Sequence, residues 1–131
     1  MNIGTAVRRI QEEMDGFRAN HRKCAAAIFI PSTGPFGKWN VATNDDCLGS
    51  GFNRVHAEIK VLMKTFSMGE RGSWMVSSSP PCPACAGAII HAGITHFVYL
   101  SDHGFRDDDV WEVEFGLRLL RENHVVVLEV D

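Results

Sequence analysis

Two short stretches decide the fold, Val55-His56-Ala57-Glu58-Ile59 and Pro81-Cys82-Pro83-Ala84-Cys85. One imidazole and two thiolates are side chains with which proteins bind zinc, and three protein ligands leave the fourth position of a tetrahedral ion open for water. A structural zinc site normally fills that position with another protein ligand, whereas a catalytic site keeps it open. The two stretches therefore predict a catalytic zinc site, provided that the fold brings them together.

His56, Cys82 and Cys85 are the predicted zinc ligands, and Glu58 is the predicted proton carrier. A bound zinc lowers the pKa of its water to about 7, and a carboxylate that is not a ligand can then move protons between water and substrate. Each half alone is ambiguous, because Cys-x-x-Cys is also typical of redox sites and zinc ribbons, and His-x-Glu occurs by chance. The combination, with Pro81 before the first cysteine, favours a zinc-dependent base deaminase.

The hydrophobic pattern predicts a three-layer α/β fold with the order α-β-β-α-β-α-β-α-β. The predicted helices cover residues 5–18, 54–66, 83–91 and 108–122, and the predicted strands cover residues 24–30, 38–44, 73–78, 95–100 and 125–130. The first two strands form a hairpin, and the last two are parallel because a helix of about four turns connects them. Residues 1–131 are expected to form a single domain.

Both metal-binding stretches fall at the predicted starts of helices. His56 and Glu58 are placed in the first turn of the helix that begins near Arg54, and the core-facing residues of that helix are predicted to be Ile59, Leu62, Met63 and Phe66. Pro83 suits the first turn of the next helix. Two such helices packed side by side on one face of the sheet would bring the three ligands together.

Composition excludes several classes of function. The 131 residues carry a formal net charge of −3 and no block of basic residues, which argues against binding to a nucleic-acid backbone. No apolar run is long enough to span a membrane, and the first residues do not resemble a signal peptide, so we expect a reducing cytoplasm. Among the other cysteines, Cys24 is predicted to be buried, and Cys47 is a candidate for a second metal site.

At these residues the chain resembles the cytidine deaminase superfamily. The resemblance implies an α-β-α cytidine-deaminase-like fold with a five-stranded mixed sheet, zinc bound by His56, Cys82 and Cys85, and Glu58 as the proton shuttle of a hydrolysis that releases ammonia. A histidine as the first ligand looks like the branch that holds deoxycytidylate deaminases, tRNA adenosine deaminases and guanine deaminases.

Within that branch two substrate classes remain open. Residues 88–94 and 98–102 look like a deoxycytidylate deaminase, which implies conversion of dCMP to dUMP, whereas Cys85-Ala86-Gly87-Ala88 is equally similar to the tRNA adenosine deaminases. Deamination of a free nucleoside or base is a further alternative. A zinc-stabilised binding module with an inactive site is the non-enzyme alternative, although a purely structural zinc gains nothing from Glu58.

The candidate substrate contacts lie near both stretches. Resemblance assigns the sugar-contacting asparagine to Asn44, with Asn53 as its rival and Asn40 as a weaker one. His103 and Phe105 are candidates for stacking on a base. The full set of candidate substrate contacts is Asn44, Asn53, Arg54, Ala57, His103, Phe105 and Arg106, where the two arginines would meet a phosphate.

The chain is also expected to form a homo-oligomer. One small domain is not expected to bury all of its large apolar side chains, among them Phe36, Trp39 and Trp111. The superfamily that the chain resembles also commonly forms oligomers. The expected partners are therefore a small-molecule nucleotide and further copies of the chain.

Overall fold

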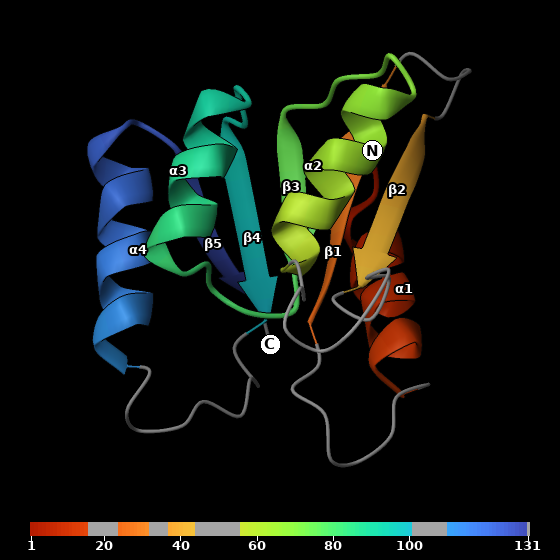
Figure 1. Ribbon diagram of the computed structural model, residues 1–131. Helices are drawn as coiled ribbons and strands as arrows, with labels where there is room; N and C mark the ends of the chain where they lie inside the picture. Colours follow the sequence, from red (N-terminus) through yellow and green to blue (C-terminus); the bar gives the residue numbers. More distant parts are fainter. Residues whose placement is uncertain (16–23, 32–36, 44–55, 101–109, 131) are drawn as a thin grey trace, which may run out of the picture.

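The computed structural model describes residues 1–15, 24–31, 37–43, 56–100 and 110–130. The order of elements in these residues is the predicted one (Figure 1). The elements are α1 (Ile3–Asp15), β1 (Ala25–Ile30), β2 (Lys38–Thr43), α2 (Ala57–Ser67), β3 (Trp74–Ser77), α3 (Pro83–His91), β4 (His96–Leu100), α4 (Val110–Glu122) and β5 (Val126–Val130).

The five strands form one mixed sheet in the order β2-β1-β3-β4-β5. β1 is antiparallel to both of its neighbours, β2 and β3, while β3, β4 and β5 run parallel to one another. The predicted hairpin and the predicted parallel pairing of the last two strands are both confirmed. Parallel neighbours need crossover connections, and the helices α3 and α4 supply them.

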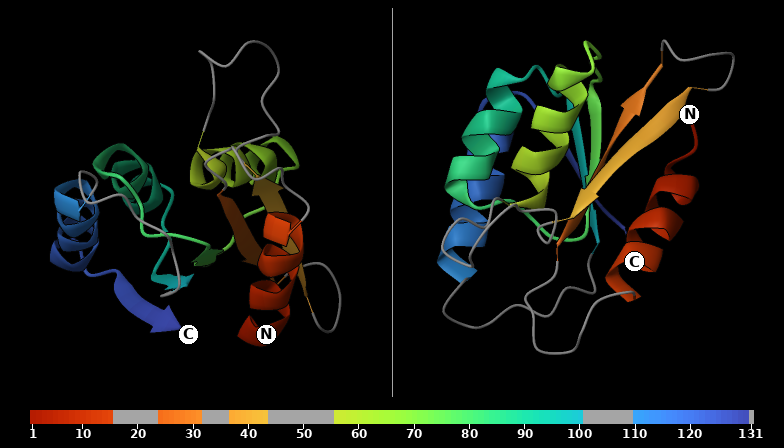
Figure 2. Two further views of the ribbon diagram at one scale, coloured as in Figure 1. Left: turned by 90° about the horizontal axis from the view of Figure 1, so that it is seen from below. Right: turned by 45° about the vertical axis from the view of Figure 1, so that its right-hand side comes forward.

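Helices cover both faces of the sheet and complete three layers. Figure 2 shows α1 alone on one face and α2, α3 and α4 side by side on the other. Each face has its own hydrophobic cluster. The cluster beneath α1 includes Ile10, Val76 and Val98, and the larger cluster beneath the three helices includes Met75 and Phe97, which alternate with Val76 and Val98 along their strands.

Helix α2 begins later than predicted. It starts at Ala57, and His56 precedes it as the N-cap with extended backbone (φ −62°, ψ 150°), so the prediction that His56 lies in the first turn is wrong. Glu58 does lie in the first turn. The predictions that Met63 and Phe66 face the core are also wrong, because these side chains are 58% and 49% exposed.

The buried face of α2 is rotated relative to the prediction. Val61, Leu62 and Thr65 are buried together with the first two residues of the helix. Thr65 fits there because its hydroxyl donates to the carbonyl of Val61 at 2.7 Å and lies 3.4 Å from the side-chain amide of Asn40, which donates to it. A polar residue thus occupies a core position that a purely hydrophobic pattern assigns to its neighbour Phe66.

The other described helix boundaries lie within two residues of the predicted ones. Helix α1 begins two residues before the predicted start, and residues 16–18 and 108–109 of the predicted helices lie outside the described residues. Helix α3 ends as predicted, because Gly93 follows it with a positive φ of 82° and donates its N–H to the carbonyl of Ile90. Within the described residues, none of the helices combines the length and the apolar character that a membrane crossing needs.

Helix α4 approaches the connection between β3 and α3 very closely. The contact is made at Gly116, which is buried, and a Cβ atom added there would overlap the carbonyl oxygen of Pro81 and come within 3.3 Å of the carbonyl carbon of Cys82. Only a residue without a side chain allows this approach. The backbone of α4 therefore packs directly against Pro81 and Cys82 and limits their movement.

Candidate active site

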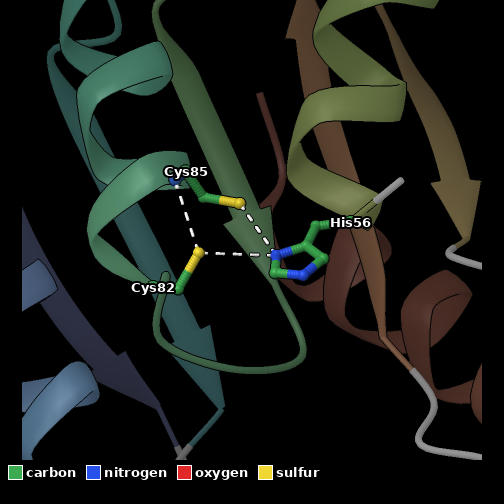
Figure 3. Close-up of side chains that lie close together, drawn as sticks. All are labelled: His56, Cys82 and Cys85. Carbon is green, nitrogen blue, oxygen red and sulfur yellow. Dashed lines mark hydrogen bonds between the residues drawn. The ribbon is translucent and has the colours of Figure 1, made fainter. Parts of the chain in front are cut away.

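The two predicted metal-binding stretches meet where α2 and α3 begin. His56 is the N-cap of α2, Cys82 is the N-cap of α3, and Cys85 lies in the first turn of α3. The imidazole and the two sulfur atoms point toward one another across the gap between the helices (Figure 3). The Nδ1 atom of His56 lies 3.2 Å from Cys85 Sγ and 3.4 Å from Cys82 Sγ. The sequence prediction that two adjacent helix starts bring these side chains together is confirmed.

This arrangement fits a tetrahedral zinc ion. With Zn–N of about 2.0 Å and Zn–S of about 2.3 Å, a ligand nitrogen and a ligand sulfur stand about 3.5 Å apart. Both measured N–S distances are close to that value, and all three candidate donor atoms lie within 4.8 Å of one another. Among the described residues, the group consists of these three side chains.

The two cysteines differ in environment. Cys85 is buried, while Cys82 is half-buried and accepts a hydrogen bond from the backbone N–H of Cys85 at 3.5 Å. A hydrogen bond from the Cys85 side chain and the nearby His56 imidazole lower the pKa of Cys82 to about 4. The Cys82 sulfur and burial raise the pKa of Cys85. Of the two side chains, Cys82 is therefore the one that more readily carries the negative charge.

Glu58 lies beside the three candidate ligands and is almost fully buried, with 3% of its surface exposed. Burial raises the pKa of its carboxyl, and hydrogen bonds from Ser77 and Cys85 offset part of that rise. A raised pKa brings the pKa of a carboxyl group closer to neutral pH, which is a common property of general acid–base residues.

Sequence reasoning missed the residue that holds Glu58. Ser77, the last residue of β3, donates its hydroxyl hydrogen to Glu58 Oε1 at 2.8 Å and is completely buried. The available signal was its position, since it shares a face of β3 with Met75, which lies under α2 and α3. A serine at the end of a strand carries no sequence signal of its own.

Of the candidate substrate contacts, only Ala57 lies within the described residues. It is fully buried at the first position of α2, where a backbone N–H has no partner inside the helix and can face a ligand. The others, Asn44, Asn53, Arg54, His103, Phe105 and Arg106, lie outside the described residues, as does Cys47.

The prediction that Asn40 is a third candidate for the sugar-contacting asparagine is wrong. Asn40 is buried in β2, and its amide donates to Thr65 and to the sulfur of Met68 at the C-terminal end of α2. At 1.5 Å per helical residue, Thr65 is about 13 Å along the helix from His56. Asn40 therefore supports the packing of α2 and does not face the site.

Solved structures share this fold across the whole chain. A dCMP deaminase from the cyanophage S-TIM5, in complex with dCMP and dUMP, matches with a TM-score of 0.66 and 20% identity, covering 99% of both chains. A guanine deaminase from Nitrosomonas europaea matches with a TM-score of 0.60 and 21% identity, covering 97% of this chain and 74% of that one. These similarities establish the cytidine-deaminase-like fold.

The sequence itself identifies the family. A comparison with curated proteins finds no match. The family model described as the cytidine and deoxycytidylate deaminase zinc-binding region matches residues 5–101, a span that contains His56, Glu58, Cys82 and Cys85. Because this match covers most of the chain and includes the whole candidate site, the chain belongs to the cytidine and deoxycytidylate deaminase family of zinc-binding enzymes.

Proposed function

We propose that the chain is a single deaminase domain that hydrolyses a cytosine mononucleotide, converting dCMP to dUMP with release of ammonia. The observation that carries the deamination is the convergence of one imidazole and two thiol side chains beside Glu58, a buried carboxyl that is not part of the ligand group. A site that served only to stabilise the fold would not need that carboxyl, which counts against an inactive binding module.

The proposed roles follow from the geometry of the side chains. His56, Cys82 and Cys85 would hold a zinc ion, which would supply a water molecule activated at neutral pH. Glu58 would accept a proton from the attacking water and pass it to a ring nitrogen while the water oxygen bonds to the amino-bearing ring carbon. It would then move the second proton, from the new hydroxyl group, to the amine, which leaves as ammonia when the C–N bond breaks. One water is consumed and one ammonia is released, so no organic cofactor is required.

A cytosine nucleotide is favoured over the alternatives by the extent of the structural match. The chain and the cyanophage dCMP deaminase cover each other almost completely, whereas this chain covers 74% of the guanine deaminase. Guanine is kept as the second candidate because that enzyme shares the fold over 97% of this chain. The net charge of −3 supports a small substrate over a polynucleotide. Asn44 or Asn53, Arg54, Ala57, His103, Phe105 and Arg106 remain the proposed substrate contacts.

One assay separates these substrates. We expect the zinc-loaded protein to release ammonia from dCMP with a kcat/KM at least about tenfold above that for cytidine or cytosine, which lack the phosphate, since a site that binds a polar group discriminates strongly against compounds without it. CMP, adenosine, guanine and a tRNA anticodon stem are compared in the same assay and should also give lower values. Ammonia release is measured for each compound at equal concentration. A preference for unphosphorylated compounds would contradict the nucleotide proposal, and absence of turnover with all of them would contradict deamination.

The thiol ligand set also favours a reducing compartment, and we propose a cytoplasmic location. Cys82 and Cys85 carry thiol side chains, and their oxidation would remove the site.

We further propose that the chain assembles with copies of itself through α2. The residues first expected to drive assembly do not support this, because Trp39 is only 7% exposed, while Phe36 and the side chain of Trp111 lie outside the described residues. Instead, Met63, Phe66 and Met68 are about half exposed at the C-terminal half of α2. A cavity of about 520 Å³ adjoins them and is lined by Ala42, Lys60, Met63, Lys64 and Ser67.

Light scattering coupled to size-exclusion chromatography tests this assembly. We expect the protein to elute as an oligomer and the double variant Met63→Lys/Phe66→Lys to elute at the mass of one chain with its fold intact, because charges cannot be buried unpaired in an interface. The matched control is the double variant Arg8→Glu/Glu12→Lys on α1, whose side chains are exposed and form an i,i+4 ion pair. A monomeric wild-type protein would contradict the proposal.

A further inference from the structure

The end of β3 carries a hydrogen-bond chain that leads to Glu58. The backbone N–H of Ser79 donates to Ser77 Oγ at 3.3 Å, and Ser77 Oγ donates to Glu58 Oε1 at 2.8 Å. All three residues are at most 5% exposed. The chain is therefore shielded from water along its length.

This chain fixes the direction in which the Ser77 hydroxyl points. A serine hydroxyl has one hydrogen to donate and accepts through its oxygen. Because the N–H of Ser79 is directed at that oxygen, the hydroxyl hydrogen is left for the carboxyl of Glu58. Ser77 thus presents a fixed donor to one oxygen of Glu58.

We propose that Ser77 is a positioning residue that holds Oε1 of Glu58, so that the other carboxylate oxygen is the one that exchanges protons with water and substrate. This inference rests on the proposed deamination. A general base must lie within hydrogen-bond reach of the proton that it moves, and a free carboxylate in a cavity can rotate away from it. Loss of the Ser77 hydroxyl would leave Glu58 in place but with more than one orientation.

The neighbouring Ser78 provides a matched control. It is as buried as Ser77, at 2% exposure, but its hydroxyl accepts a hydrogen bond from the backbone N–H of Ala25 at 3.0 Å and serves the pairing of β1 with the chain after β3. Ser78→Ala removes a buried hydroxyl at the same strand end without touching Glu58. It reports the cost of such a loss to folding alone.

The kinetic experiment compares Ser77→Ala, Ser77→Thr and Ser78→Ala in the zinc-loaded protein. We expect Ser77→Ala to lower kcat about 10- to 100-fold with KM within about twofold, since displacement of a catalytic group by a fraction of its length has effects of this size. Ser77→Thr retains a hydroxyl and should recover most of kcat. Ser78→Ala should keep kcat within about twofold of the wild-type value. Equal kcat in Ser77→Ala and wild type, or an equal loss in Ser78→Ala, would overturn the proposal.

A second measurement does not depend on turnover. Crystal structures of the zinc-loaded wild-type protein and of Ser77→Ala should show Glu58 in one orientation beside Ser77 in the former, and displaced or in several orientations in the latter. The same single orientation in both would overturn the proposal even if the enzyme is active. If no substrate is turned over but Glu58 is displaced in Ser77→Ala, the proposed function fails and the positioning role of Ser77 stands.

Discussion

Glu58→Gln is expected to lower kcat for deamination by about 10²- to 10⁴-fold, which is the range that general acid–base catalysis contributes. An amide has nearly the shape of a carboxyl and can still accept the hydrogen bond from Ser77, so the buried position remains filled. The amide cannot take up and release a proton near neutral pH. We therefore expect the fold and the zinc content to be retained while ammonia release is nearly lost.

Three measurements on each protein check this result. They are steady-state ammonia release, zinc per chain and the temperature of thermal unfolding. The matched control is Glu70→Gln, which makes the same chemical change at a carboxylate that lies 3.6 Å from the ammonium of Lys38, away from the site. Glu70→Gln should keep its kcat. Turnover of Glu58→Gln near the wild-type rate would exclude Glu58 as the proton carrier.

Cys82→Ser is expected to reduce bound zinc from about one ion per chain to less than roughly a tenth of that, because a neutral hydroxyl does not replace a thiolate ligand. Serine is the better choice than alanine here, since Cys82 is also the N-cap of α3 and serine is a favoured N-cap residue. Helix α3 should therefore keep its start. Loss of zinc can then be assigned to the missing ligand and not to a frayed helix.

Zinc content is measured after dialysis, and thermal unfolding is measured with and without added zinc. A ligand that binds only the folded state raises its stability, so zinc should raise the unfolding temperature of the wild-type protein and leave that of Cys82→Ser unchanged. Cys24→Ala is the matched control, because the sulfur of Cys24 lies 3.6 Å from Ser79 Oγ and Cys24 is not part of the group formed by His56, Cys82 and Cys85. Equal zinc content in Cys82→Ser and wild type would remove Cys82 from the ligand set.

The order of elements and the ligand group were predictable because their signals are local. Cys-x-x-Cys after a strand places two thiols at a helix start wherever the rest of the chain lies, and the alternation of apolar segments sets the order of strands and helices. The histidine needed one further assumption, that α2 and α3 pack side by side. The two parallel crossovers, through α3 and α4, kept the topology within the few arrangements that such connections allow.

Other features were not predictable because they depend on contacts between distant segments. Phe66 is exposed and Thr65 buried because Asn40 of β2 supplies a polar partner beneath α2, which no helical periodicity reveals. His56 is the N-cap of α2 with extended backbone and not a residue of its first turn, and an N-cap histidine has no sequence signature. Ser77 acquires its role only from the carboxyl that the fold places opposite it.

The contact between Gly116 and the Pro81 carbonyl extends the metal site into the last helix of the fold. Any side chain at position 116 must push either α4 outward or the peptide that leads into Cys82 forward, and the second movement would displace Cys82 relative to His56 and Cys85. The size of residue 116, which is not a candidate ligand, can thus affect the geometry of the candidate metal site. A larger residue at position 116 would then disturb the arrangement of His56, Cys82 and Cys85 although all three side chains are retained.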